Sequence, residues 1–319
     1  MSNWLDLVKQ SNYIALFAHI NSDGDANGSV MAMASYLKSL DKQVFVFIPT
    51  PINQSYWFLG SNKVSCKKRD KHYDLAIGLD CPNTKRFGQC EPEFFKADKT
   101  INIDHHADND MFADVNIVDV DKSSVCELLY DLFKQDNIKI SKQMATALYT
   151  GIATDTGGFT HGSHGDVSAQ TFSALADLTN CGAELNIVNY NLFTHMRKPV
   201  FELLKTGLDV LEFYADGKIA VVAITRKMLD TAGADISDTH RIKDIIGEID
   251  GVEISVIMAE NKPCENYISV RSKTHSAQRI CKHFGGGGHI RASGCRLYIP
   301  LENAKKQLVA ECLKELDRI

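Results

Sequence analysis

Short apolar runs alternate with longer amphipathic segments through the first half of the chain. The runs are IALFAH (14–19), QVFVFIP (43–49), DLAIGLD (74–80) and TINID (100–104). Apolar runs of this length are typical of strands that are buried on both faces of a sheet. GSVMAMASYLKSL (28–40), between the first two runs, has its apolar residues at helical spacing. Strands that alternate with helices predict an α/β fold, with a parallel sheet covered by helices on both faces.

Two further helices are predicted where a serine precedes a helical pattern. SSVCELLYDLFKQ (123–135) has Ser123 or Ser124 as its N-cap and Glu127 in its first turn. SKQMATALYTGIATD (141–155) is the second of these helices, and it ends at an aspartate that precedes a turn.

The pattern changes in the second half of the chain. Residues 186–213 are mostly of helical type. Shorter strand patterns follow, namely GKIAVVAIT, VEISVIMAEN, NYISVRSK and ASGCRLYIP, and an amphipathic helix from Glu302 ends the sequence. We therefore expect a first domain over 1–185, a linker and connecting helix over 186–214, and a smaller mixed α/β domain over 215–319.

Composition and charge narrow the class of protein. The 319 residues are enough for two domains, and 44% hydrophobic with 24% charged residues is typical of a globular protein. The net charge of −5 argues against a protein that coats long nucleic acid, but it permits a small phosphorylated substrate. The nine cysteines form no CxxC pair, and we find no signal-peptide pattern and no apolar run of membrane-spanning length. These features predict a cytoplasmic protein with reduced thiols and no membrane partner.

Acidic residues and histidines follow the ends of several predicted elements. They are His19, Asp23 and Asp25 after the first strand, Asp80 after the third, Asp104, His105 and His106 at the end of the fourth, and Asp155 at the end of a helix. Because the carboxyl ends of parallel strands meet at one edge of a sheet, these side chains are expected to converge on one crevice. Carboxylates packed this closely repel one another unless cations lie among them.

Mixed aspartate and histidine ligands fit a transition-metal ion such as Mn²⁺ better than Ca²⁺, which prefers oxygen ligands alone. The number of ligands predicts two ions, roughly 3.5–4 Å apart and bridged by one carboxylate, an arrangement that activates water for phosphoryl transfer. Each residue by itself has a plainer interpretation: Asp80 as a turn former or helix cap, Asp23 and Asp25 as a solvated turn, and the paired histidines as part of a loop. The recurrence of the same residue types at the ends of successive elements favours the metal site.

A second group of residues lies in the predicted smaller domain. VRSK (270–273) ends a strand with two cations, and GGGGHIRASG (285–294) is a glycine loop that contains His289 and Arg291. Glycines let backbone N–H groups approach a phosphate, and arginine binds phosphate oxygens with two N–H groups at once. A flexible loop explains the glycines alone, but with Arg271, His289 and Arg291 nearby the pattern favours a phosphate pocket.

These motifs, in this order and spacing, resemble those of the DHH/DHHA1 phosphoesterases over about Tyr13 to Pro300. They are HINSDGDANGS, the strand-end Asp80, Asp104-His105-His106, Asp155 and GGGGHIRASG. Within that family the chain is similar to the short, stand-alone oligoribonucleases (nanoRNases) that also act as phosphatases of 3′-phosphoadenosine 5′-phosphate (pAp). The resemblance implies a catalytic DHH domain with a parallel sheet and a smaller DHHA1 substrate-binding domain that closes over a cleft.

The resemblance also implies a role for each motif residue. His19 and Asp23 are implied to hold one Mn²⁺, and Asp25, His105 and Asp155 are implied to hold the other. Asp80 is implied to bridge the two ions. Asp104 is implied to orient the histidines, and His106 to contact the scissile phosphate. A terminal phosphate of the substrate is implied to bind residues of the smaller domain: Arg271, Ser272, Gly287, Gly288, His289 and Arg291.

Two features depart from the family pattern. Ser22 stands where the first motif commonly has proline, which removes some loop rigidity but no ligand. THGSHGDV (160–167) carries His161 and His164, which we interpret as solvated loop histidines, with contact to a substrate base as the alternative.

We therefore predict a Mn²⁺-dependent phosphohydrolase that cleaves short oligoribonucleotides to nucleoside 5′-monophosphates and converts pAp to AMP. A homodimer is compatible with this fold class. Alternatives within the enzyme class are a cyclic di-AMP or linear dinucleotide phosphodiesterase, and an inorganic pyrophosphatase, which the GGGGH loop disfavours. RecJ-like exonucleases share the core but usually add nucleic-acid-binding modules, for which 319 residues leave little room. An alternative of another class is a non-catalytic nucleotide-binding protein, which the complete ligand set disfavours.

Overall fold

The computed structural model describes residues 3–61, 71–160, 167–288 and 290–318. The chain divides into two compact units, Met1–His195 and Met196–Ile319. The segment 186–214, for which the sequence predicts a linker and connecting helix, is shared between the two units. Within the described residues, none of the helices combines the length and the apolar character needed to cross a membrane.

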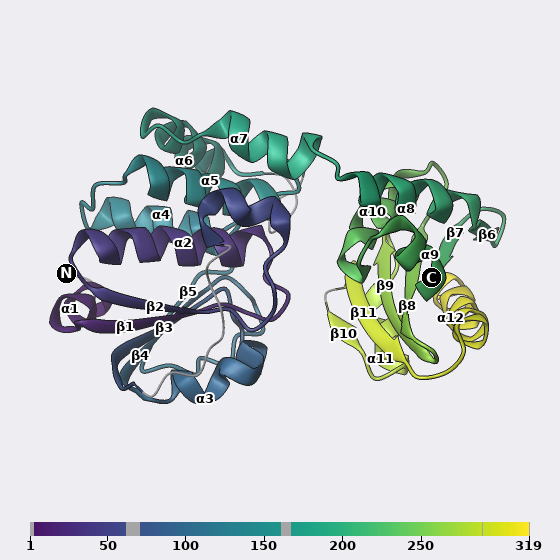
Figure 1. The fold of residues 1–319 in the computed structure, drawn as a ribbon, viewed down its shortest axis with the longest axis horizontal. Helices are drawn as coiled ribbons and strands as arrows, with labels where there is room; N and C mark the ends of the chain where they lie inside the picture. Colours follow the sequence, from purple (N-terminus) through teal and green to yellow (C-terminus); the bar gives the residue numbers. More distant parts are fainter. Residues whose placement is uncertain (1–2, 62–70, 161–166, 289, 319) are drawn as a thin grey trace. The chain divides into compact units, whose positions relative to one another are not determined.

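A five-stranded parallel sheet forms the centre of the first unit (Figure 1). Its strands lie in the order β2-β1-β3-β4-β5. They are β1 (Tyr13–Phe17), β2 (Gln43–Phe47), β3 (Tyr73–Leu79), β4 (Ala97–Asp104) and β5 (Val115–Val118). The four predicted strands and the parallel sheet are confirmed. The sequence pattern does not predict β5, because this strand has only four residues, all half-buried, and is too short to show a period.

Helices cover both faces of this sheet, as predicted. Over one face lie α2 (Gly24–Ser39), α4 (Val125–Gln135) and α5 (Lys142–Asp155), and over the other lie α3 (Glu91–Phe94) and the 3-10 helix η3 (Thr84–Cys90) (Figure 1). The remaining elements of the unit are α1 (Asn3–Gln10), η1 (Gln54–Leu59), α6 (Ala169–Asn180), α7 (Leu185–Asn189) and the helical turn η4 (Tyr190–Thr194).

Two of these helices start at capping side chains near the carboxyl ends of the strands. The hydroxyl of Ser124 caps α4 and accepts the backbone N–H of Glu127, so the second of the two serines is the cap. The carboxylate of Asp23 caps α2 and accepts the N–H groups of Asp25 and Ala26. The chain therefore enters both helices with a polar side chain beside the strand ends.

Two glycines let α2 and α5 approach each other closely. A Cβ atom at Gly28 would lie 2.4 Å from the backbone oxygen of Ala147, and one at Gly151 would lie 2.6 Å from a carboxylate oxygen of Asp25. Real Cβ atoms essentially never come within 3.0 Å of another heavy atom, so this approach depends on glycine. Because α2 carries Asp25 and α5 ends in Asp155, the same approach sets how near these two carboxylates lie.

A six-stranded mixed sheet forms the second unit, as predicted for the smaller domain. The strand order is β10-β11-β9-β8-β7-β6, and β7 and β8 are parallel while the other neighbours are antiparallel. The strands are β6 (Leu211–Tyr214), β7 (Ile219–Ile224), β8 (Ile254–Lys262), β9 (Glu265–Ser272), β10 (Gly287–Gly288) and β11 (Ala292–Leu297).

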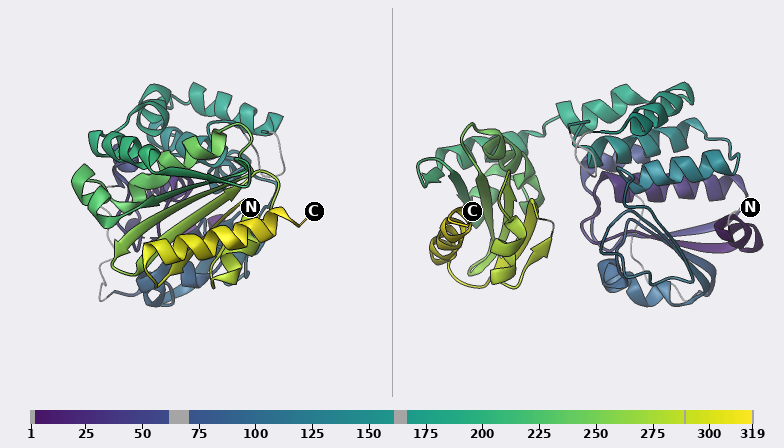
Figure 2. Two further views of the ribbon diagram at one scale, coloured as in Figure 1. Left: turned by 90° about the vertical axis from the view of Figure 1, so that its right-hand side faces the viewer. Right: turned by 180° about the vertical axis from the view of Figure 1, so that it is seen from behind.

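Helices lie on both faces of the mixed sheet. One face carries α8 (Lys198–Asp209), α9 (Arg226–Ala232) and α10 (His240–Glu248), and η5 (Ile236–Thr239) precedes α10. The opposite face carries α11 (Ala277–His283) and α12 (Leu301–Leu316), and Figure 2 shows α12 running along the strands. The predicted final helix is thus confirmed as α12.

Gly28→Ala tests the close approach of α2 and α5. The added methyl group meets the Ala147 carbonyl, which belongs to a helix backbone and cannot move aside freely. Overpacking costs about 1–3 kcal/mol, which exceeds the gain in helix propensity of up to about 1 kcal/mol. We expect the free energy of unfolding, measured by urea denaturation, to fall by about 1–2 kcal/mol.

Lys38→Ala, at an exposed position of the same helix, is the control. We expect it to change the free energy of unfolding by less than about 0.5 kcal/mol. A Gly28→Ala protein as stable as the wild type would show that the two helices do not need this contact distance.

Candidate metal centre and phosphate site

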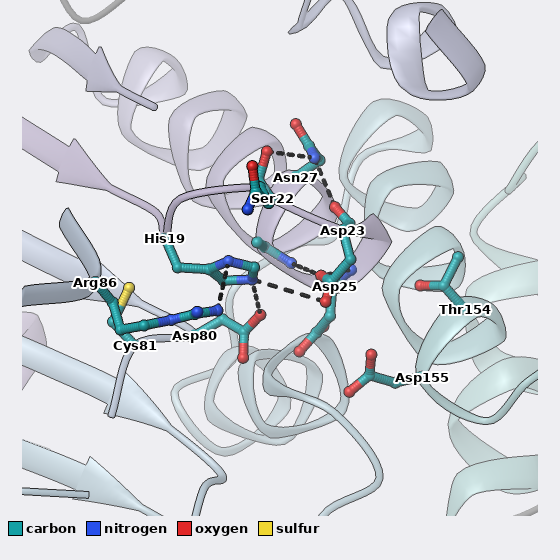
Figure 3. A network of polar contacts seen from close by, with 12 residues as sticks. His19, Ser22, Asp23, Asp25, Asn27, Asp80, Cys81, Arg86, Thr154 and Asp155 are labelled. Atoms are coloured by element: carbon teal, nitrogen blue, oxygen red, sulfur yellow. Dashed lines mark hydrogen bonds and ion pairs between the residues drawn. The ribbon is translucent and has the colours of Figure 1, made fainter. Parts of the chain in front are cut away.

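The predicted metal ligands meet at the point where the strand order of the parallel sheet reverses. β1 lies between β2 and β3, so connections lead away from this point in both directions. Open α/β sheets bind their ligands at such a point, outside the carboxyl ends of the strands. His19 follows β1 and Asp80 follows β3. Figure 3 shows these two side chains facing each other, with Asp23, Asp25 and Asp155 around them.

His19, Asp23 and Asp80 form one group of potential ligands. The Nε2 atom of His19 lies 3.3 Å from Oδ2 of Asp80 and 3.7 Å from Oδ2 of Asp23. Asp23 uses its other oxygen, Oδ1, to cap α2. The helix cap therefore holds the Asp23 side chain in place and leaves one oxygen toward His19.

Asp25, His105 and Asp155 form a second group. The Nε2 atom of His105 lies 3.4 Å from Oδ2 of Asp155 and 3.7 Å from Oδ1 of Asp80. The carboxylate of Asp25 is fully buried and accepts the first two N–H groups of α4, at 2.7 and 2.9 Å. A helix N-terminus favours a negative charge, so α4 positions Asp25.

Asp80 contacts both groups. Its Oδ2 faces His19 and its Oδ1 faces His105. The residue is buried, and among the described residues its Oδ1 has no hydrogen-bond partner. Its backbone φ is 59°, a left-handed conformation that is uncommon outside glycine and that clusters at functional sites. A buried carboxylate oxygen without a donor fits a metal ion as its partner.

The two histidines are held in the tautomer that can bind a metal. Nδ1 of His105 lies 3.1 Å from the carbonyl oxygen of Lys122, and Nδ1 of His19 lies 2.7 Å from that of Ile20. A ring nitrogen that faces a carbonyl carries the hydrogen, so Nε2 of each ring would present its lone pair to a metal ion that takes the place of a proton there.

The charges of the site act strongly on one another. Burial lowers the pKa of His19, but Asp23 and Asp80 outweigh burial and raise this pKa to about 10. Burial and the charge of Asp80 raise the pKa of Asp25 to about 7, and burial with the neighbouring carboxylates raises the pKa of Asp155. Without a metal ion, these side chains therefore keep protons that reduce the repulsion among the carboxylates. Divalent cations can take the place of those protons. The residues of the site therefore fit divalent metal binding.

His106 is oriented differently from the two other histidines. Its Nδ1 lies 2.8 Å from Oδ1 of Asp104, whose other oxygen accepts a hydrogen bond from Asn109 at 2.6 Å. The sequence analysis expects Asp104 to orient both adjacent histidines. In the structure this carboxylate contacts His106, and the Lys122 carbonyl orients His105 instead. Strand alternation explains the difference, because neighbouring side chains leave the end of β4 in different directions.

The predicted phosphate-binding residues lie at the end of β9 and in the glycine loop. Arg271 is half-buried, and its guanidinium donates to the Ser269 hydroxyl at 3.2 Å. Ser272, the next residue, points to the opposite face of the sheet, and its hydroxyl donates to the carbonyl of His275. Arg291 is exposed and donates to the same carbonyl at 2.8 Å. The side chains of Arg271 and Ser272 thus leave the strand on opposite faces, and the joint phosphate contact that the resemblance implies for them stays a prediction.

The glycine loop closes against β11. A Cβ atom at Gly288, whose φ is 138°, would lie 2.7 Å from the carbonyl oxygen of Ala292, so this position requires glycine. Gly287 pairs with Gly294 in the same strand pair. Three histidines of the sequence analysis lie outside the described residues: His161, His164 and His289. The loop role of the first two and the phosphate-binding role of His289 stay predictions.

Comparison with known proteins connects this geometry with a family. Residues 13–152 match the model described as the DHH family, N-terminal domain. The match lies within the first unit and defines a DHH domain there. A probable bifunctional oligoribonuclease and PAP phosphatase, NrnA, of Streptococcus mutans is 28% identical, over 93% of this chain and 93% of its own length.

Two further comparisons extend over nearly the whole chain. The bifunctional oligoribonuclease and PAP phosphatase NrnA of Thermus thermophilus is 28% identical, over 98% of this chain and 93% of its own length. The crystal structure of an exopolyphosphatase-related protein from Bacteroides fragilis has a TM-score of 0.89 and 25% identity, and it covers 98% of this chain and 94% of its own. The similarity therefore includes both units.

The DHH domain also contains polar partners that the sequence analysis does not identify. Arg86, on η3, has its Nη2 atom 3.0 Å from Nδ1 of His19 (Figure 3). This nitrogen cannot donate to Ile20 and accept from Arg86 at once, and a metal ion on Nε2 would favour the bond to Ile20. Arg86 would then remain as a positive charge beside the carboxylates. The sequence analysis does not single out Asn109, because this residue stands between Asp108 and Asp110 in a loop with the composition of a solvated turn.

Asp80→Asn tests the metal centre of the DHH domain. Asparagine keeps the size of the side chain and tolerates a left-handed backbone, but it removes the charge. A ligand that binds only the folded state, at a concentration 100-fold above its Kd, raises the free energy of unfolding by about 2.7 kcal/mol. In a domain of this size this corresponds to a rise in Tm of about 5–10 °C. We expect Mn²⁺ to raise the thermal unfolding midpoint of the wild type by this order and to have little effect on Asp80→Asn.

Asp108→Asn is the matched control, because Asp108 is exposed in the loop that follows His106. This variant should respond to Mn²⁺ like the wild type. In EDTA, Asp80→Asn should be at least as stable as the wild type, since one of the repelling charges is gone. An equal response to Mn²⁺ in Asp80→Asn and the wild type would contradict the ligand assignment.

Proposed function

We propose that the chain is a metal-dependent phosphohydrolase that cleaves short oligoribonucleotides to nucleoside 5′-monophosphates and converts pAp to AMP. The observation that supports this most directly is the pair of ligand groups that share contacts with Asp80. Two adjacent divalent cations are a common arrangement for the hydrolysis of phosphate esters. The names of the two NrnA relatives point to the same class of substrate.

We propose two Mn²⁺ ions as the cofactor. The proposed ligands are the side chains of the two groups, His19 with Asp23 and Asp25 with His105 and Asp155, with Asp80 shared. Mixed imidazole and carboxylate ligands favour Mn²⁺ over Ca²⁺ and Mg²⁺, which are bound mainly by oxygen. When bound, such ions lower the pKa of water and stabilise the negative charge of the reacting phosphate.

His106 is proposed to contact the scissile phosphate. Its Nδ1 hydrogen is donated to Asp104, and this bond fixes the ring and stabilises a positive charge on it. Asn109 binds the second oxygen of Asp104 and holds the carboxylate in turn. A charged imidazole donates a strong hydrogen bond to a phosphate oxygen, and this bond strengthens as negative charge develops there.

Arg271 and the backbone at Gly287 and Gly288 are proposed to bind a terminal phosphate of the substrate. The guanidinium can donate two N–H groups to one phosphate, and the glycines leave backbone N–H groups accessible. Binding of the terminal phosphate limits the length of the oligonucleotide that the enzyme cleaves. The net charge of −5 agrees with a short substrate, because long RNA requires a broad basic surface.

Product analysis on a substrate panel tests this proposal. The panel contains a dinucleotide, a five-residue RNA, pAp, cyclic di-AMP and pyrophosphate, each incubated with Mn²⁺ and separated by chromatography. We expect mononucleotides from both RNAs and AMP from pAp, and we expect Asp80→Asn to lower kcat at least about 100-fold. Asp108→Asn should retain wild-type activity.

The panel also separates the proposal from its alternatives. Hydrolysis of pyrophosphate alone would identify a pyrophosphatase and reject the proposed substrates. Cleavage of cyclic di-AMP without cleavage of the short RNAs would assign a cyclic-dinucleotide phosphodiesterase. Binding of nucleotides without any turnover would indicate a non-catalytic binding protein.

A further inference from the structure

Glu127, in the first turn of α4, is a buried carboxylate that belongs to neither ligand group. Only 2% of the residue is exposed. Its Oε2 atom accepts three hydrogen bonds: from the backbone N–H of Ser123 at 3.1 Å, from the hydroxyl of Ser123, and from the hydroxyl of Thr171 at 3.0 Å. Burial of a carboxylate is costly unless donors compensate for it, so the fold supplies donors that hold this one in place.

A helix cap explains part of this arrangement. Ser124 is the N-cap of α4, and its hydroxyl accepts the N–H of Glu127. In a capping box the glutamate at this position accepts the N–H of the cap residue itself. Here it accepts the N–H of the preceding residue, Ser123. The carboxylate therefore fixes a peptide unit that lies outside the helix, and capping gives no reason for that choice.

The peptide unit between Lys122 and Ser123 joins Glu127 to a candidate metal ligand. Its N–H donates to the Glu127 carboxylate, and its carbonyl oxygen lies 3.1 Å from Nδ1 of His105. A peptide unit is planar, so the direction of its N–H sets the direction of its C=O. The carboxylate on one side therefore determines where the carbonyl oxygen stands for His105 on the other side.

The charge of Glu127 acts along the same path. A carboxylate polarises the N–H that it binds, and hydrogen bonds in a chain strengthen one another, so the Lys122 carbonyl becomes a stronger acceptor. An imidazole whose Nδ1–H is held by a stronger acceptor is a more basic ligand at Nε2. In the common arrangement a carboxylate binds the imidazole of the ligand directly. For His105, one peptide unit stands between the carboxylate and the ring.

The two ligand groups are held by different parts of the fold. His19 and Asp23 take their direction from the chain that follows β1 and from the start of α2. Asp25 and His105 take theirs from the start of α4 and from the peptide unit before it. A change at Glu127, which lies on α4, is therefore expected to act on the second group and to leave the first.

From these contacts we infer that Glu127 is a positioning residue for His105: acting through the peptide unit between Lys122 and Ser123, it orients the ring and strengthens it as a metal ligand. The inference rests on the proposed function, since it concerns the metal centre of that function. Glu127 itself contacts neither substrate nor metal in this account. Loss of its charge weakens one metal site selectively, which a purely structural role does not predict.

Glu127→Gln is the test, because glutamine keeps the size of the side chain and an oxygen for Ser123 but removes the charge. Titration with Mn²⁺, followed by the electron paramagnetic resonance signal of the free ion, gives the Kd of each bound ion. A partner of a metal ligand contributes about 10- to 100-fold to metal affinity. We expect one of the two Kd values to rise at least about 10-fold and the other to change less than about threefold.

Leu132→Ala is the control that separates positioning from stability. Leu132 is buried on the same helix, beyond its first turn, so truncation lowers Tm without a change at the peptide unit. We expect it to lower Tm at least as much as Glu127→Gln does, while both Kd values stay within about threefold of those of the wild type. Unchanged Kd values in Glu127→Gln, or an equal rise in both, would overturn the inference.

A measurement without metal keeps this inference separate from the proposed hydrolysis. In ¹⁵N-labelled protein in EDTA, solvent exchange of the ring Nδ1 proton of His105 reports its hydrogen bond to Lys122. We expect this exchange to be at least about 10-fold faster in Glu127→Gln, and that of His106, which Asp104 holds directly, to stay the same. If the wild type hydrolyses no substrate of the panel, the proposed function fails, and the exchange rates still decide the role of Glu127. Equal rates for His105 in both proteins would reject that role.

Discussion

The concentration of carboxylates around Asp80 is the constraint on which the rest of the DHH domain depends. These charges repel one another, so the fold holds them with donors of its own: the start of α2 binds Asp23, and the start of α4 binds Asp25. Each of these aspartates is both a helix cap and a candidate metal ligand. Because a helix N-terminus favours negative charge, the contacts that begin the helices also position the carboxylates.

The first unit contains a group of charges that its own side chains leave unbalanced. Buried carboxylate oxygens and imidazole nitrogens face one another there, which calls for cations. Divalent cations in such an arrangement serve the hydrolysis of phosphate esters, so the charge pattern supports that class of substrate.

The sequence alone predicts the regular elements and the charged residues at their ends, because periodicity and residue type are visible without the third dimension. Arg86 lies on the short 3-10 helix η3 and Asn109 lies in a loop, so no long period gives the direction of either side chain, and their partners appear only in the structure. The partner of the Ser272 hydroxyl, the carbonyl oxygen of His275, likewise appears only in the structure.

The number of Mn²⁺ ions bound per chain tests the central claim most directly. Equilibrium dialysis of the full chain at saturating Mn²⁺, followed by elemental analysis, counts the ions in the wild type and in Asp80→Asn. Two ligand groups that share Asp80 predict two ions per chain in the wild type and at most one in the variant. Fewer than two ions in the wild type, or two in Asp80→Asn with wild-type affinity, would contradict the account.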